Sequence, residues 1–148
     1  MTNDSLDVDK QTMDKSSHLI THVIFDLDGT LIDSEKYFHS TIIDVLDSYG
    51  KTMDWELRSK TIGLFMTKAV PIMIEYYNLN VTAEEFITQM LSRFKLYCCG
   101  EIDNVGVQLL PGVKKILEYF SHHQIPMALC TASMEETYHF KVCLPLFN

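Results

Sequence analysis

A short apolar stretch that ends in two closely spaced aspartates constrains this chain more than any other feature. Residues 19–25 are mostly apolar and predict a buried β-strand. Asp26 and Asp28 follow, and because alternate residues of a strand point the same way, both carboxylates can converge just past its C-terminal end. Gly29 permits the turn that comes next. Ligands of open α/β sheets bind at this edge, so the pattern predicts an α/β fold with its site here.

The two carboxylates indicate a particular chemistry. Carboxylate oxygens are hard ligands that suit Mg²⁺, so Asp26 and Asp28 are candidate metal ligands. The same pair can supply one nucleophile and one general acid or base, which makes both residues catalytic candidates. A plainer alternative is an aspartate-rich loop after a core strand, with Asp28 and Gly29 forming an ordinary turn.

Residues 26–35 read Asp-x-Asp-Gly-Thr-Leu-x-Asp-Ser-Glu and resemble the first motif of the haloacid dehalogenase-like hydrolases. The resemblance implies a Mg²⁺-dependent phosphoric monoester hydrolase in which Asp26 attacks phosphorus and forms an aspartyl-phosphate. It implies that Asp28 protonates the leaving oxygen and then activates water. It also implies that Mg²⁺ bridges Asp26, the backbone carbonyl of Asp28 and the phosphate.

Helical patterns fill the middle of the chain. Apolar residues at helical spacing predict four helices, over residues 35–49, 55–62, 67–77 and 83–97. Thr82 and Glu85 form a capping box that opens the fourth of these helices. Residues 36–107 therefore interrupt the α/β pattern, and we interpret them as an inserted all-helical cap, as the family resemblance also implies. A cap closes over the site, excludes water and selects the substrate.

The other residues divide into a tail and a core. Residues 1–18 are polar and predict a disordered tail. Residues 19–35 and 108–148 form the predicted α/β core, a partial Rossmann-like parallel sheet. Within it, residues 125–130 predict a second strand parallel to the first, which the chain reaches through a helix that starts near Val113.

Small and hydroxyl-bearing residues follow this second strand. The Thr131 hydroxyl and the backbone N–H groups of Ala132 and Ser133 can hold phosphate oxygens, so all three are predicted substrate-binding residues. An apolar strand that ends in Ser or Thr resembles the family's second motif. The alternative is a simple helix cap, with Ser133 opening a helix.

The resemblance also implies residues that do not follow in this sequence. The family's third motif supplies a lysine that neutralises the phosphate and the nucleophile, and its fourth supplies acidic residues that complete the Mg²⁺ site. Both should lie many tens of residues after Thr131, whereas the sequence ends 17 residues later, at Asn148. Lys141 follows Thr131 too closely to be that lysine. We therefore expect a C-terminally truncated core whose open apolar sheet edge promotes self-association.

The composition limits the classes of partner that we expect and the cellular compartment in which we expect the protein. The net charge of −8 argues against a nucleic-acid partner. No apolar run is long enough to span a membrane, and the N-terminus lacks the apolar region of a signal peptide. Four cysteines without a Cys-x-x-Cys pair fit reduced thiols, so we expect a cytoplasmic protein.

These observations predict a phosphatase that acts on a small phosphorylated metabolite, such as a nucleotide or a sugar phosphate. Within the family, the helical cap and the Leu-Pro-Gly-Val junction at residues 110–113 look most like the pseudouridine-5′-phosphatase branch. Pseudouridine 5′-phosphate is therefore a candidate substrate. The alternative is a catalytically inactive truncated isoform or fragment that acts, if at all, as a binding module.

Overall fold

A small parallel sheet and six helices make up residues 20–142, which the computed structural model describes. The strands are β1 (Val23–Phe25) and β2 (Met127–Leu129), and the helices are α1 (Glu35–Ser48), α2 (Trp55–Thr61), α3 (Met66–Tyr77), α4 (Ala83–Cys98), α5 (Val113–His122) and α6 (Glu135–Val142). The predicted tail, residues 1–18, lies outside the described residues, and so do Leu19 of the predicted first strand and the last part of the predicted core, residues 143–148.

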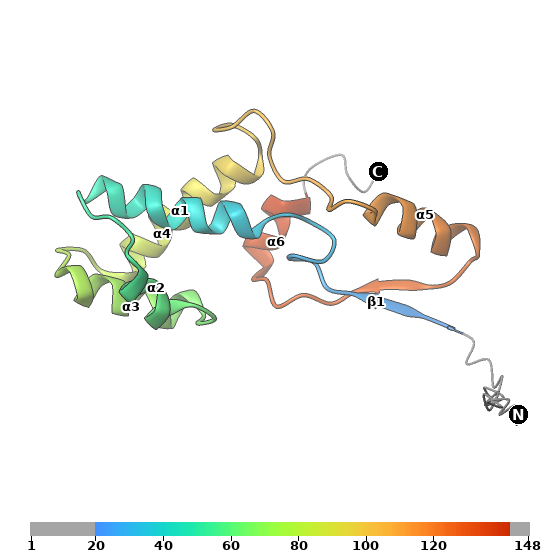
Figure 1. Cartoon of the computed structure of the whole chain (residues 1–148), viewed down its shortest axis with the longest axis horizontal. Coiled ribbons are helices and arrows are strands. Elements are labelled where there is room, and N and C mark those ends of the chain that lie inside the picture. Colours follow the sequence, from blue (N-terminus) through green and yellow to red (C-terminus); the bar gives the residue numbers. More distant parts are fainter. Residues whose placement is uncertain (1–19, 143–148) are drawn as a thin grey trace, which may run out of the picture.

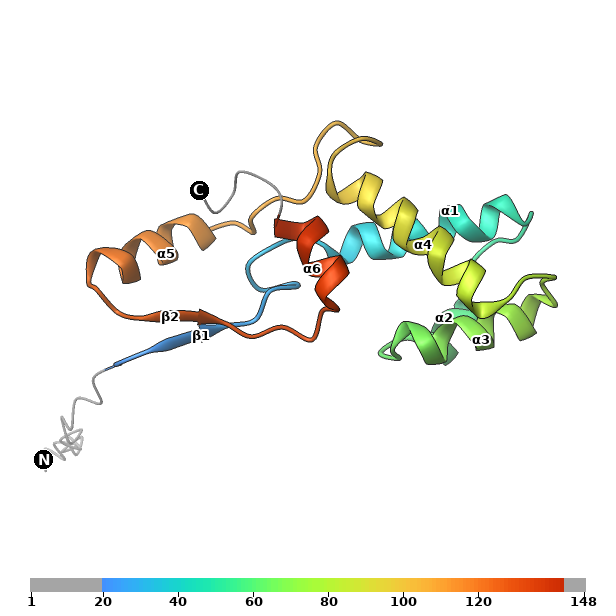
Figure 2. The same ribbon diagram turned by 180° about the vertical axis from the view of Figure 1, so that it is seen from behind.

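The described part of the chain is elongated. Helices α1–α4 gather at one end, the two strands and α5 lie at the other, and α6 lies between them (Figures 1 and 2). This arrangement is the predicted one, an α/β fold with a small parallel sheet and a helical cap. None of the helices in residues 20–142 has the length and apolar character needed to cross a membrane.

The two strands run parallel, as predicted. Val23 pairs with Met127 and Phe25 with Leu129, and the Cys130 N–H donates to the Phe25 carbonyl at 2.8 Å. The prediction that the first strand is buried was wrong, because Ile24 is 71% exposed and its neighbours Val23 and Phe25 are only partly buried. Burial of a strand requires a layer over each face. In residues 20–142, α5 lies along one side of the strands, where the Phe120 ring packs on Phe25.

Helices α1–α4 enclose a hydrophobic core of their own. Its buried members come from all four helices and are Ile42, Val45, Leu46, Leu57, Ala69, Val70, Met73, Phe86 and Met90. The four helices begin and end within two residues of their predicted bounds. The predicted capping box is also confirmed, since the Thr82 hydroxyl accepts from the Glu85 N–H while the Glu85 carboxylate accepts from the Thr82 N–H.

A second apolar cluster joins the helical end of the molecule to the loop after β1. Leu27 and Ile32 of that loop are fully buried against Tyr37 of α1 and against Phe94 and Cys98 of α4. The cluster therefore holds the aspartate-bearing loop on two helices of the predicted cap. This packing fixes where the loop lies relative to the cap helices.

Replacing Thr82 by alanine should lower the free energy of unfolding by about 0.5–2 kcal/mol, because the first turn of α4 loses its capping hydroxyl. Urea unfolding followed by circular dichroism measures the change. Thr88→Ala is the matched control on the same helix, since the Thr88 hydroxyl is exposed and bonds only to the Glu84 carbonyl. It should change stability by less than about 0.5 kcal/mol. An equal loss in both variants would contradict the capping role.

Candidate active site

The loop after β1 turns sharply and presents its two aspartates differently. The Leu31 and Ile32 N–H groups both donate to the Leu27 carbonyl, at 2.9 and 3.1 Å, which closes a tight turn around the buried Leu27 side chain. Gly29 has a φ of +69°, a left-handed conformation that glycine adopts without strain. Asp26 precedes the turn and is exposed, whereas Asp28 lies within it and is half-buried.

The Asp28 carboxylate is the centre of a polar network. The Ser34 hydroxyl donates to Asp28 Oδ1, and the Ser133 hydroxyl donates to Asp28 Oδ2 at 2.7 Å. Lys141 Nζ lies 2.7 Å from Asp28 Oδ1 and also donates to Ser133 Oγ at 2.8 Å. The network therefore ties the loop after β1 to α6 and to the segment that precedes it.

The network keeps Asp28 ionised. Burial by itself raises the pKa of this carboxyl, but hydrogen bonds from Lys141, Ser34 and Ser133, together with the lysine charge, outweigh burial and leave the pKa below its usual range. The lysine belongs to the same buried unit, because its side chain is only 9% exposed. A carboxylate held in this way is charged before a substrate binds, and its lowered pKa makes it a weak base.

The predicted substrate-binding residues lie at the start of the segment that leads from β2 to α6. The Thr131 hydroxyl accepts from the Ser133 N–H at 3.1 Å, so it shapes the turn that aims Ser133 at Asp28. Ala132 and Ser133 line a cavity together with Asp28. The structure thus brings Asp28, Ala132 and Ser133 together at this cavity. Asp26 and Thr131 do not line it, although each lies within two residues of a lining residue in the sequence.

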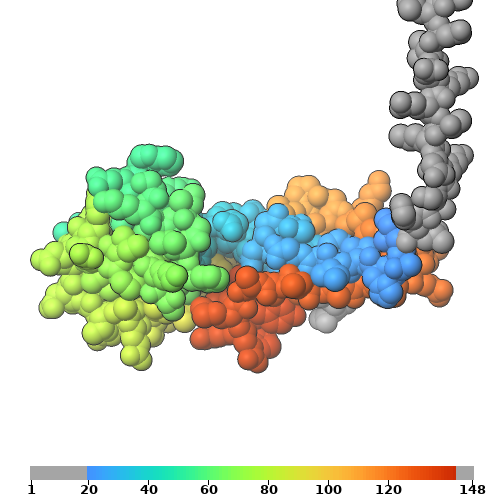
Figure 3. Space-filling model, turned by 90° about the horizontal axis from the view of Figure 1, so that it is seen from below, coloured from blue at the N-terminus to red at the C-terminus, as the bar shows by residue number. Residues whose placement is uncertain are grey.

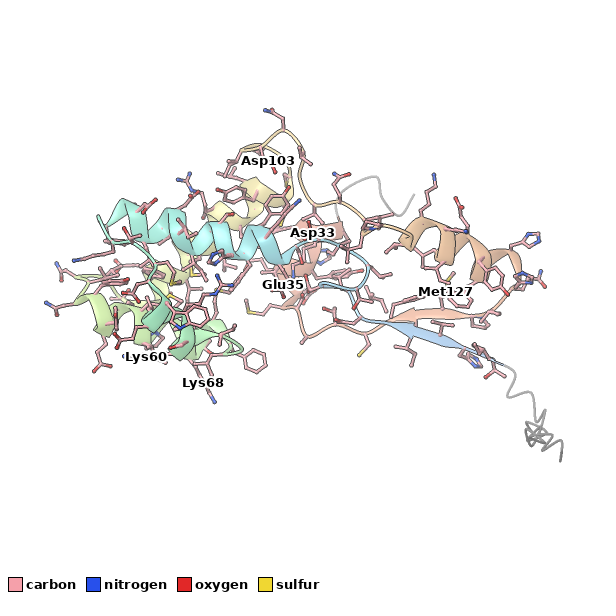
Figure 4. All side chains as sticks on the ribbon, viewed as in Figure 1. Asp33, Glu35, Lys60, Lys68, Asp103 and Met127 are labelled. Atoms are coloured by element: carbon pink, nitrogen blue, oxygen red, sulfur yellow. The ribbon has the colours of Figure 1, made fainter. Side chains whose placement is uncertain are left out.

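This cavity, about 430 Å³ in volume, separates the helical end of the molecule from the polar network. Its polar floor includes Asp28, Ser34, Ser133 and Lys141. Its apolar walls are Phe38, Leu64, Phe65, Met66, Ile87, Met90, Leu91, Phe94, Ala132 and Met134. Figure 3 shows α6 (red) beside the helical end (green) and against the residues at and after β1 (blue). Glu35, which also lines the cavity, lies where α1 leaves the aspartate loop (Figure 4).

Lys141 was not predicted to be a site residue, yet in the structure it contacts the candidate catalytic residue Asp28. A signal was present, because Ser133, Thr137 and Lys141 follow one another at four-residue spacing and so fall on one face of a helix. Thr137 and Lys141 are both buried on α6. A buried lysine needs a partner, and here that partner is Asp28.

The oxygen donors present suit Mg²⁺, although the described residues hold no cluster of three or more metal-binding side chains. Both carboxylate oxygens of Asp28 are engaged by protein donors. Its backbone carbonyl, in contrast, accepts none of the backbone hydrogen bonds within residues 20–142. That carbonyl and the exposed Asp26 carboxylate are hard oxygen ligands, and Mg²⁺ commonly binds few protein groups and keeps several waters.

The sequence matches a known protein family and is similar to individual named phosphatases. The family model for haloacid dehalogenase-like hydrolases matches residues 23–143. A probable pseudouridine-5′-phosphatase of Drosophila melanogaster is 31% identical over 114 residues, which are 77% of this chain and 47% of that protein. The mitochondrial (DL)-glycerol-3-phosphatase 1 of Arabidopsis thaliana is 32% identical over 124 residues, 82% of this chain and 39% of that protein.

Two solved structures are similar to this chain in fold. A provisionally assigned beta-phosphoglucomutase of Thermotoga maritima superposes with a TM-score of 0.68 at 25% identity, over 82% of this chain and 54% of that chain. A hydrolase of Deinococcus radiodurans with bound phosphate and sodium gives a TM-score of 0.60 at 22% identity, over 84% and 52% of the two chains, and shows the same fold. This chain thus spans about half the length of the proteins it matches.

Proposed function

Because the chain belongs to the haloacid dehalogenase-like hydrolase family, we propose that it hydrolyses a small phosphate monoester with Mg²⁺, through an aspartyl-phosphate on Asp26. The observation that carries the proposal is the aspartate pair after β1. One member is exposed, and the other is held by Ser34, Ser133 and Lys141 on the floor of a cavity large enough for a small metabolite.

The two aspartates divide the chemistry between them. The exposed Asp26 carboxylate attacks phosphorus, so that a bond from Asp26 to phosphorus forms while the bond from phosphorus to the leaving oxygen breaks. Asp28 takes up a proton from solvent when the substrate binds, passes it to that leaving oxygen and then accepts a proton from the water that cleaves the aspartyl-phosphate. Because the network lowers the pKa of Asp28, the uptake of a proton by this carboxylate is the demanding part of the cycle.

Other groups of the chain position the phosphate. Thr131, Ala132 and Ser133 orient the phosphoryl oxygens at the start of the segment that leads to α6. The Asp26 carboxylate and the Asp28 carbonyl would hold Mg²⁺, which supplies charge neutralisation when it is bound. Residues 36–107 act as a cap, and residues 19–35 with 108–148 act as the core.

The apolar walls of the cavity indicate which class of substrate would fit. A nucleotide or sugar phosphate remains the proposed class, and Phe38, Phe65 and Phe94 favour a substrate with an unsaturated ring. Pseudouridine 5′-phosphate meets that description, and the name of the Drosophila relative refers to it. We place the protein in the cytoplasm, because Cys98, Cys99 and Cys130 are free thiols.

A second candidate function is a binding module without turnover. It is favoured by the engagement of both Asp28 oxygens with protein donors. The exposed apolar side chains of the strands, Ile24 and Met127 among them, would then support self-association along the sheet.

The deciding experiment is Mg²⁺-dependent release of inorganic phosphate from a generic aryl phosphate by the purified chain. We expect turnover that EDTA stops and added Mg²⁺ restores. Pseudouridine 5′-phosphate should then be hydrolysed with a higher kcat/KM than glycerol 3-phosphate, which lacks a ring to fill the apolar walls. Soluble, folded protein without turnover on any of the three esters would favour the binding module.

A further inference from the structure

We propose that Lys141 is the cation that binds the substrate phosphate in this chain. The proposal rests on the proposed function only in taking the cavity as the place where a phosphate ester binds. Among the cavity-lining residues, Lys141 is the single cationic side chain, whereas Asp28 and Glu35 carry negative charge. Of the side chains that line this cavity, Lys141 is therefore the one that can offset the repulsion between a phosphate dianion and the acidic floor.

The ammonium group of Lys141 has a donor to spare. A lysine side chain carries three N–H donors. In the described part of the chain, Asp28 Oδ1 at 2.7 Å and Ser133 Oγ at 2.8 Å account for two of them. The third can donate to a phosphate oxygen without breaking either contact. Such a charge-assisted bond is stronger than one between neutral groups.

The burial of Lys141 is informative as well. Its side chain is 9% exposed and packs near the Phe94 ring, with Nζ 5.6 Å from the ring centroid. Holding a cation out of water is costly, and an apolar side chain of similar size commonly serves stability as well or better. A low-dielectric position also strengthens attraction to an anion. The position thus makes Lys141 a poor choice for stability alone and an effective anchor for phosphate.

The test measures binding of inorganic phosphate by calorimetric titration with Mg²⁺ present. Lys141→Met should weaken phosphate binding at least about tenfold, and Lys141→Arg should recover part of the loss. Lys114→Met is the matched control, because the Lys114 side chain is 81% exposed on α5, and it should bind phosphate as the unmodified chain does. Folded Lys141→Met protein with unchanged phosphate affinity would overturn the proposal.

A second measurement decides the matter if Lys141→Met does not fold. The chain is labelled with ¹³C at lysine, and the Lys141 resonance is identified by its absence from the Lys141→Arg spectrum. Added phosphate should shift this resonance, and saturating phosphate that leaves it unmoved overturns the proposal. Phosphate binding that depends on Lys141 without ester turnover would support this inference and reject the phosphatase. Ester turnover together with phosphate binding that does not depend on Lys141 would support the phosphatase and overturn this inference.

Discussion

Asp26→Asn should reduce phosphate release at least about 10³-fold and leave the thermal midpoint of unfolding unchanged. Asparagine keeps the shape of the side chain, but its amide oxygen is a poor nucleophile, so the aspartyl-phosphate cannot form. Asp26 is exposed, and its carboxylate forms none of the hydrogen bonds or ion pairs found within residues 20–142, so the fold does not depend on its charge. Initial rates on an aryl phosphate, with melting curves in parallel, measure both effects.

Asp33→Asn is the matched control for this prediction. Asp33 lies in the same loop, and its carboxylate forms an ion pair with Lys36 at 3.1 Å in which the two side chains are 40% and 47% exposed. Its loss should leave phosphate release within about twofold, since exposed pairs of this kind contribute little. Retention of more than a tenth of the activity by Asp26→Asn would exclude Asp26 as the nucleophile.

Sequence patterns predicted the elements whose formation depends on neighbouring residues. The apolar spacing of Phe86, Met90 and Phe94 predicted one face of α4, and all three are buried. The Thr82 and Glu85 pair predicted where that helix begins. Both signals act within a few residues, so they hold whatever the rest of the chain does.

Features that depend on distant parts of the chain were not predictable in this way. The apolar residues of β1 suggested a buried strand, but burial requires partner layers, and Ile24 remains largely exposed. The sequence gives no reason to distinguish Asp26 from Asp28, whereas in the structure, with its turn at Gly29, Asp26 is exposed and Asp28 is half-buried. Lys141 lies beside Asp28 where α6 packs against α4, and this packing joins segments that are far apart in the sequence.

Asp28→Leu should destabilise the chain by about 3–5 kcal/mol, near the lower end of that range because the Asp28 side chain is 24% exposed. The variant leaves the Lys141 ammonium buried without its anionic partner. Lys141→Met should cost less, since Asp28 would keep the donors Ser34 and Ser133 and its own access to water. Urea unfolding of both single variants gives the two values.

The double variant, Asp28→Leu with Lys141→Met, should be more stable than Asp28→Leu alone, because it removes the stranded charge and puts apolar groups in its place. A double-mutant cycle then gives a coupling energy between the two sites. Losses that simply add would mean that the ion pair does not hold α6 to the aspartate loop. In that case the packing of Tyr138 and Phe140 of α6 on the apolar cluster that includes Phe94 of α4 would keep Lys141 beside Asp28.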